Sequence, residues 1–255
     1  MLNYYDTTIA YLVVSVVLII SGMLFSTAGI VIILIITLFY VSLSVVASAR
    51  IQMNFYIKAI NRGNKKRAKV ALTFDDGPDE STTVKILDIL EKHKIKAAFF
   101  CIGSRIEKNR EIAKKISDRG HIIGNHSWSH AFLFDFYLPG KMVREIEKTD
   151  EIIKEITGRR VEFFRPPYGV TNPFLSKAVK KTGHTVLGWS LRTFDTMKDG
   201  NYVLKKIESR LSGGDIILLH DTNPQTVEIL DDIIKIIKKG GMEIVRLDYL
   251  INDDI

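Results

Sequence analysis

Hydrophobic and polar positions divide the chain into two unlike parts. Residues 9–49 carry no charged side chain and consist mainly of Ile, Leu, Val, Phe and Ala. This run is about twice the ~20 apolar residues that a helix needs to cross a bilayer, and the small residues Ser26-Thr27-Ala28-Gly29 interrupt it. We predict two transmembrane helices, about residues 9–25 and 29–49, joined as a tight hairpin. A single long tilted span is the alternative.

From residue 68 onward, short apolar runs alternate with longer stretches of helical periodicity. Short runs bounded by turn residues are typical of strands, and apolar positions three or four residues apart indicate helices. We expect strands at residues 69–72, 97–101, 122–124, 162–164, 185–189, 216–219 and 243–245. We expect helices at about residues 82–92, 106–119, 141–157, 173–182, 202–211 and 227–239.

Regular alternation of strands and helices predicts parallel strands joined by right-handed crossovers. Seven strands, six of them followed by helices, favour an α/β barrel of fewer than eight strands that is closed or nearly closed. An open doubly wound sheet is the alternative, which the lack of a glycine-rich nucleotide loop in the sequence disfavours. The expected domains are a transmembrane segment at 1–49, a linker at 50–67 and an α/β domain at 68–255.

Basic residues gather directly after the apolar segment. Seven of the 36 lysines and arginines lie from Arg50 to Lys69, with no acidic residue among them, and the rest of the α/β domain is nearly neutral. This basic linker would suit anionic lipid head groups. No basic patch with interleaved aromatic residues occurs in the sequence, so we expect no nucleic-acid partner.

The basic linker also bears on sidedness. The positive-inside rule would place it, and the α/β domain with it, in the cytoplasm, but the rule weakens where a large domain is translocated. No basic residue precedes the apolar run, so we expect no cleaved signal peptide. The single cysteine, Cys101, allows no internal disulfide and is compatible with either compartment.

Polar side chains follow the predicted strands at the points where the strands end. Because the carboxyl ends of barrel strands meet at one rim, we expect these groups to lie together. A solvated Asp-Asp turn would otherwise be the ordinary interpretation of residues 75–76. The groups are Asp75 and Asp76, His126 and His130, Arg165 and Tyr168, Asp195, and His220 with Asp221.

Two histidines of this set have metal-ligand spacing. His126 and His130 are four residues apart, so one helical turn would place both imidazoles on one face. This spacing alone is more often a surface or capping arrangement. With a carboxylate from the first strand, however, it forms a two-histidine, one-carboxylate metal site with open positions. These ligands predict Zn²⁺, and Co²⁺ or Mn²⁺ is compatible with them.

Two further rim residues suit acid–base chemistry. His220 is either a buried structural histidine or a general acid, because the pKa of imidazole lies near neutral pH. Arg165 precedes the stiff Pro166-Pro167 turn, which would aim it inward, where a guanidinium would keep a catalytic carboxylate ionised and oriented.

Four ordered motifs resemble those of the polysaccharide deacetylase family, which is carbohydrate esterase family four with the NodB-homology domain. The resemblance covers about residue 68 to the C-terminus, and the combination is highly specific. It implies a distorted (β/α)7 barrel, preceded here by the N-terminal transmembrane helical hairpin. The motifs are TFDDGP at Thr73–Pro78, HSWSH at His126–His130, RPPYG at Arg165–Gly169 and LLHD at Leu218–Asp221.

The resemblance also implies a role for each site residue. Asp76, His126 and His130 would bind the divalent metal, which would polarise the acetamido oxygen. Asp75 would be the general base toward the attacking water, and Arg165 would position it. The backbone N–H of Tyr168 would hold the oxyanion, and His220 would protonate the departing amine.

One motif departs from the family pattern. Arg192 stands where the family commonly has the aspartate that supports the catalytic histidine. The orientation of His220 is therefore open, and Asp195 would tune either Arg165 or His220.

Together these features predict a membrane-anchored, metal-dependent hydrolase that removes N-acetyl groups from a glycan containing N-acetylglucosamine, such as peptidoglycan, and releases acetate. The first alternative is a cytoplasmic-face deacylase or deformylase of a lipid-linked sugar. The second is a catalytically silent membrane scaffold, supported only by Arg192. The expected partners are the glycan and the lipid bilayer, and an extracytoplasmic catalytic domain is favoured.

Overall fold

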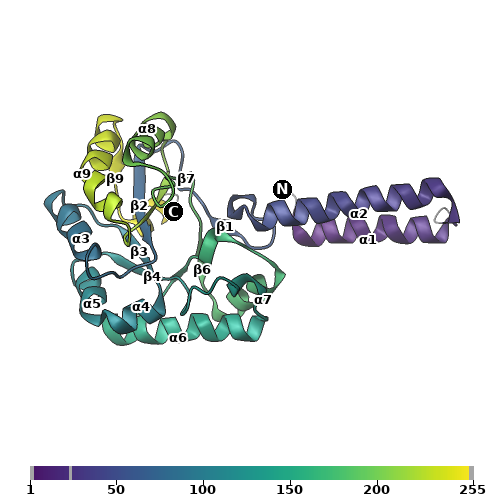
Figure 1. The fold of residues 1–255 in the computed structure, drawn as a ribbon, viewed down its shortest axis with the longest axis horizontal. Coiled ribbons are helices and arrows are strands. Elements are labelled where there is room, and N and C mark those ends of the chain that lie inside the picture. Colours follow the sequence, from purple (N-terminus) through teal and green to yellow (C-terminus); the bar gives the residue numbers. More distant parts are fainter. Residues whose placement is uncertain (1–2, 23–24, 253–255) are drawn as a thin grey trace.

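The computed structural model describes residues 3–22 and 25–252, which form a helical hairpin and an α/β domain (Figure 1). The helices are α1 Tyr4–Ile20, α2 Thr27–Ser48, α3 Thr83–Lys92, α4 Gly103–Lys108, α5 Arg110–Asp118, α6 Pro139–Thr157, α7 Pro173–Thr182, α8 Gly200–Arg210, α9 Pro224–Lys239 and α10 Leu247–Asn252. The strands are β1 Ala59–Ile60, β2 Lys69–Asp75, β3 Ala98–Cys101, β4 Ile122–Asn125, β5 Phe163–Phe164, β6 Thr185–Leu187, β7 Leu191–Arg192, β8 Ile216–His220 and β9 Glu243–Ile244.

The apolar segment forms two helices that lie side by side rather than one long helix (Figure 1). The Tyr11 and Tyr40 rings stack at 4.7 Å across the pair, and the hydroxyls of Thr8 and Tyr40 are hydrogen-bonded. By length and composition, α2 could cross a membrane, because its 22 residues extend about 33 Å. The 17 residues of α1 begin earlier than expected and make a shorter apolar helix, so membrane insertion of both helices stays a prediction.

The strands form a curled parallel sheet with helices on its outside (Figure 1). Their order is β1-β6-β5-β4-β3-β2-β8-β7, and every pair along this path is parallel. The parallel α/β architecture was thus predicted correctly. Two short strands, β1 and β7, were not predicted, and they end the path on either side. The last expected strand, β9, pairs with the first residues of β2 instead of continuing the barrel.

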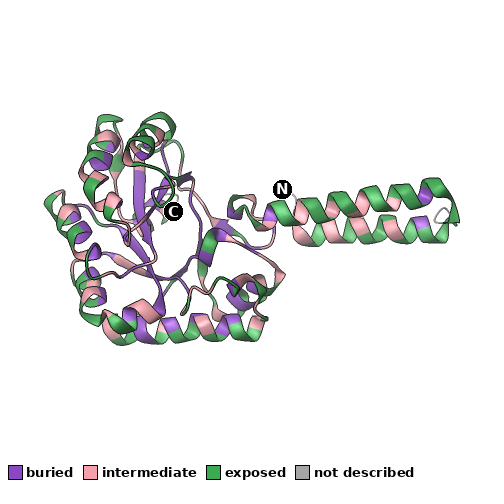
Figure 2. Ribbon diagram, in the orientation of Figure 1, coloured by how far each residue is buried: buried purple, intermediate pink, exposed green. Residues whose placement is uncertain are grey.

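Alternation along β2 separates the apolar core from the polar interior of the sheet. Val70, Leu72 and Phe74 point into the core beneath α3, α8 and α9, whereas Ala71 belongs to a second cluster on the other face. Because side chains alternate along a strand, Thr73 and Asp75 share the face of Ala71. Figure 2 shows the resulting pattern, with buried residues in the sheet and exposed ones on the outer helix surfaces. The alternation along β2 thus places the Asp75 carboxylate in the polar interior of the sheet.

Several helices begin and end where their capping residues predict. Asn172 accepts a hydrogen bond from Leu175 N, and Pro173 occupies the first turn of α7, where no intrahelical N–H is needed. Gly158 adopts φ 68° after α6, a left-handed conformation that glycine reaches without a steric penalty. The expected helix at 106–119 is instead two helices, α4 and α5, with Asn109 between them.

The hairpin is attached directly to the α/β domain. Ser48, the last residue of α2, accepts from Thr171 N at 2.9 Å and donates its hydroxyl to Thr171 O at 2.6 Å. Ile51 is buried in the domain core, and Gln52 donates to Trp189 O. Tyr4, at the start of α1, donates its N–H to Phe55 O. The segment at 50–67 is therefore packed against the domain along much of its length rather than being an extended tether.

Candidate active site

Asp75 is held by an arginine from the opposite side of the sheet. Asp75 ends β2, and Arg165 follows β5, with Arg165 Nη1 2.6 Å from Asp75 Oδ1. Arg165 is fully buried over the Phe100 ring and also donates to Thr73 Oγ1 and to the carbonyls of Leu187 and Gly188. Burial lowers the pKa of Arg165, although the Asp75 charge opposes this shift. Arg165 therefore engages Oδ1 of Asp75, and Oδ2 faces the cavity.

Asp76, His126 and His130 converge as a three-ligand group. The Nε2 atoms of both histidines lie 3.5 Å from Asp76 Oδ1, and the three ligand atoms lie within 4.8 Å of one another. Tetrahedral Zn²⁺ with ligands at about 2.0–2.1 Å places neighbouring ligand atoms roughly 3.4 Å apart. His126 Nδ1 is bound to Arg165 O at 2.7 Å, which directs Nε2 at the site. The donor set and its spacing therefore fit a divalent metal.

The two histidines are close for a different reason than expected. Residues 126–130 are not helical, and Ser127 and His130 have φ of 62° and 47°. A turn forms instead because Asn125 Oδ1 accepts from Ser127 N, and Ser127 Oγ accepts from His130 N. The helical interpretation was wrong because these local side-chain hydrogen bonds replace the backbone ladder of a helix.

The electrostatics of Asp76 and His130 favour the forms that bind a metal, whereas those of His126 favour its protonated form while no cation is bound. Burial alone would raise the pKa of Asp76, but His126 and His130 outweigh it and lower the pKa well below its usual range. Burial and the neighbouring His126 lower the pKa of His130 to about 4. Burial would likewise lower the pKa of His126, yet Asp75 and Asp76 raise it. Asp76 is thus ionised and His130 neutral at neutral pH, as metal ligands must be.

His220 is oriented by Asp195 and not by a residue at the position of Arg192. His220 Nδ1 lies 2.9 Å from Asp195 Oδ1, and Asp195 Oδ2 accepts from His220 N and from the Thr226 hydroxyl. Burial alone would lower the pKa of His220, but the hydrogen bond and charge of Asp195 raise it to about 9. Arg192 is exposed at the cavity edge, with its guanidinium 4.9 Å from the centre of the Phe194 ring. Although Arg192 replaces the aspartate of the family motif, the His220 imidazolium still has a carboxylate partner in Asp195.

Tyr168 completes the rim. It has φ 58°, its hydroxyl donates to His130 O at 3.3 Å, and within the described chain its backbone N–H has no hydrogen-bond acceptor. A cavity of about 270 Å³ brings the site residues together. Its lining consists of Asp75, Asp76, His126, His130, Tyr168, Gly169, Trp189, Arg192, Thr196, Leu218 and His220.

Three supporting residues, Thr73, Trp189 and Asp221, were given no role from the sequence, although Asp221 was placed at the rim. Thr73 bridges Arg165 and Ile217 O, and Trp189 covers Gly169, whose added Cβ would lie 2.2 Å from the indole. Asp221 is fully buried, accepts from the Thr83 hydroxyl, and has a pKa raised by burial to about 7. Thr73 and Asp221 lie within the TFDDGP and LLHD motifs, which was the available signal. The position of Trp189 had no such signal.

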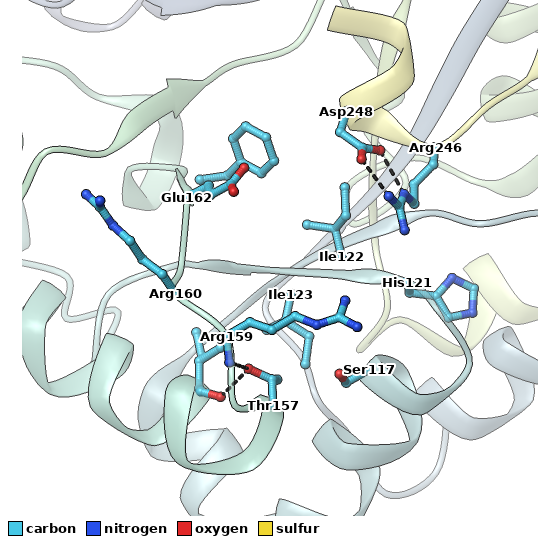
Figure 3. A pocket seen from close by; sticks show the side chains of 12 residues that line it. Ser117, His121, Ile122, Ile123, Thr157, Arg159, Arg160, Glu162, Arg246 and Asp248 are labelled. Atoms are coloured by element: carbon cyan, nitrogen blue, oxygen red, sulfur yellow. Dashed lines mark hydrogen bonds and ion pairs between the residues drawn. The ribbon is translucent and has the colours of Figure 1, made fainter. Parts of the chain in front are cut away.

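A second hollow lies at the other end of the sheet (Figure 3). Its volume is about 170 Å³, and Ile122 and Phe163, the first residues of β4 and β5, line it. Arg246 forms a bidentate ion pair with Asp248 there. This hollow contains none of the rim residues, so the chemistry is assigned to the cavity around Asp75.

Comparisons with known proteins agree with this geometry. The sequence profile of the family described as Polysaccharide deacetylase matches residues 62–187. Peptidoglycan-N-acetylglucosamine deacetylase PgdA of Listeria monocytogenes is 33% identical over 192 residues, which are 75% of this chain but only 40% of PgdA. The chain thus spans less than half the length of that relative.

Two further comparisons cover more of both proteins. Peptidoglycan-N-acetylmuramic acid deacetylase PdaA of Bacillus subtilis is 33% identical over 207 residues, 78% of each chain. Its solved structure matches with a TM-score of 0.68, covering 75% of this chain and 84% of that one. BA3943 of Bacillus anthracis, described as a CE4 family pseudoenzyme, matches with a TM-score of 0.71 at 27% identity, covering 76% and 68%. By its motifs, its fold and its similarity to PdaA over most of both chains, this chain belongs to the polysaccharide deacetylase family.

Proposed function

We propose that this chain is a membrane-anchored, metal-dependent hydrolase that removes N-acetyl groups from a glycan containing N-acetylglucosamine and releases acetate. Peptidoglycan is the preferred substrate, because both relatives named above as deacetylases act by name on peptidoglycan sugars. The observation that carries the proposal is the convergence on one cavity of Arg165-bound Asp75, Asp195-bound His220 and the three-ligand group.

The residues divide the reaction between two sides of the cavity. Asp76, His126 and His130 would hold the divalent metal, most suitably Zn²⁺, which supplies Lewis-acid polarisation of the acetamido carbonyl. Asp75 Oδ2 would take a proton from the water that attacks the carbonyl carbon, while Arg165 holds Oδ1 in place. The Tyr168 N–H would donate to the developing oxyanion.

His220 would complete the reaction by protonating the departing nitrogen. Asp195 binds Nδ1, so Nε2 is the ring nitrogen available to the amine. A pKa raised to about 9 keeps the imidazole protonated at neutral pH, the form that a general acid requires. Cleavage of the C–N bond would then give acetate and a free amino sugar.

The direct test is acetate release by the purified full-length protein from N-acetylglucosamine oligomers and from peptidoglycan. Asp75→Asn should abolish turnover, and Asp231→Asn should retain it, because Asp231 pairs with Lys92 and His93 far from the cavity. Equal rates in the wild type and Asp75→Asn would overturn the mechanism. Absence of turnover on every acetylated sugar tried would instead favour the silent scaffold.

A second function stays in competition because of the basic linker. The seven basic residues from Arg50 to Lys69 favour a domain on the cytoplasmic side, where a deacylase or deformylase of a lipid-linked sugar would act. A reporter fused after Ile255 and active in only one compartment would decide between them. An external signal would support the glycan deacetylase, and an internal signal would redirect the substrate to lipid-linked sugars.

A further inference from the structure

The loop at residues 131–138, between His130 and α6, exposes large apolar side chains. Phe132 is 85% exposed and Phe136 is 80% exposed, and Leu133 and Leu138 are more than half exposed. Phe174, near the start of α7, is exposed as well. We call these five residues the apolar patch. Soluble surfaces rarely gather so many large apolar groups without a partner.

The exposure does not come from a loosely held loop. Phe134 is fully buried in the core, and the ring of Tyr137 lies 5.9 Å from it. Asn172 Nδ2 donates to Asp135 O at 2.7 Å, which fastens the loop to the residue before α7. The backbone is therefore held at its centre while Phe132 and Phe136 point outward.

The apolar patch adjoins the base of the helical hairpin. Asn172, which binds the loop, follows Thr171, and Thr171 makes two hydrogen bonds with Ser48 at the end of α2. In Figure 1, α7 and the base of the hairpin lie on the same side of the α/β domain. A bilayer crossed by α2 would thus lie close to the patch.

The chemistry of the patch suits lipid better than sugar. Its Phe and Leu side chains have no polar atoms, whereas glycan surfaces must meet many hydroxyls with hydrogen-bonding groups. Exposed Lys141 and Arg144 follow the loop on α6, and Lys177 lies three residues from Phe174 on the same face of α7. Apolar side chains flanked by cations are typical of surfaces that rest in an anionic lipid interface.

We propose that the apolar patch inserts into the interface of the same bilayer that α2 crosses, so that the catalytic rim rests at the membrane surface. The proposal rests on the membrane insertion of α2 in the proposed function. His130 directly precedes the loop, and the Tyr168 hydroxyl binds His130 O, so the cavity opens beside the patch. The substrate class that follows is an N-acetylated sugar held close to the membrane rather than one deep in a distant polymer.

The test uses the full chain with one introduced cysteine at a time, because the native Cys101 is buried and would not be labelled. Phe136→Cys reports on the patch and Leu38→Cys on the middle of α2. Tyr249→Cys is the control, because Tyr249 is exposed on α10 and follows Asp248, which lines the hollow at the other end of the sheet from the rim. Each variant carries an environment-sensitive fluorophore in vesicles of phosphatidylcholine and phosphatidylglycerol. Spin-labelled lipids should quench positions 136 and 38, and iodide should quench position 249.

The outcomes separate the patch from the anchor. One outcome would overturn the patch proposal and leave the membrane anchor intact. In that outcome, lipid quenches position 38, while iodide quenches position 136 as strongly as position 249. If spin-labelled lipids quench neither position 38 nor position 136, membrane insertion itself is rejected. Shielding of position 136 only after addition of N-acetylglucosamine oligomers would assign the loop to the glycan, which also overturns the proposal. Acetate release, measured on the same samples, tests the deacetylase activity separately.

Discussion

Arg165 and Asp75 form a buried ion pair across 90 residues of chain, with Nη1 2.6 Å from Oδ1. The remaining guanidinium donors bind Thr73 Oγ1 and the carbonyls of Leu187 and Gly188. One arginine thus connects β2 to the end of β6 and fixes the carboxylate assigned as general base. Its structural and catalytic contributions are linked, because the same contacts serve both.

Arg165→Met should destabilise the protein by about 3–5 kcal/mol, because it leaves a buried carboxylate and two carbonyls without donors. Chemical denaturation of the full chain measures the free energy of unfolding. Arg210→Met is the matched control, since Arg210 is exposed at the end of α8 and should change stability by less than about 0.5 kcal/mol. Similar losses in the two variants would contradict the structural role of the Arg165–Asp75 pair.

Asp195→Asn should move the alkaline limb of the pH–activity profile to lower pH. Burial lowers the pKa of His220, but Asp195, together with Asp75 and Asp76, raises it to about 9. Removing the Asp195 charge therefore lets that pKa fall, and the general acid loses its proton at lower pH. The measurement is the dependence of kcat on pH for acetate release. An unchanged alkaline limb would show that His220 is not the acid.

The same pair should make stability depend on pH. The pKa of His220 is higher in the folded protein than the ordinary 6.5. Its contribution is therefore fully present below pH 6.5 and is lost as pH rises through about 9. Thermal unfolding between pH 6 and 10 would show this loss in the wild type, and the loss should be much smaller in Asp195→Asn.

Chelation should abolish acetate release, and added Zn²⁺ should restore it. Zn²⁺ should also stabilise the folded chain, by about 2.7 kcal/mol at a metal concentration of 100 Kd. His130→Ala should remove both effects, because it deletes one of three ligands, while His93→Ala should keep them. A Zn²⁺-dependent rise in Tm that survives in His130→Ala would place the metal elsewhere.

Gly169→Ala should be more damaging than Gly158→Ala, although the two glycines have φ of 69° and 68°. The backbone strain is therefore similar, at roughly 1 kcal/mol. An added Cβ at Gly158 meets open space, whereas at Gly169 it would lie 2.2 Å from the Trp189 ring. We expect an extra loss of about 1–3 kcal/mol from overpacking, together with reduced activity because Trp189 lines the cavity. Equal unfolding free energies would contradict this packing.

Local information was sufficient for much of this protein. Helical periodicity predicted α7 at residues 173–182 and the end of α6 at residue 157, and the order of strand ends predicted one rim. These features depend on residues a few positions apart, and the sequence displays such residues directly. The same reasoning failed at residues 126–130, where side-chain hydrogen bonds of Asn125 and Ser127 compete with helical backbone bonds.

The sequence by itself therefore determined the succession of elements, the apolar N-terminal segment and the residue types at the rim. Only the tertiary structure decided which residues are partners. His220 is hydrogen-bonded to Asp195, which is 25 residues away in the sequence. The Arg165–Asp75 pair is separated by 90 residues, and the Ser48–Thr171 pair by 123. Strand order, the unpredicted β1 and β7, and the position of the apolar patch beside α2 are decided in the same way. Such pairings are set by how the whole sheet curls and packs, and no periodicity along the chain encodes them.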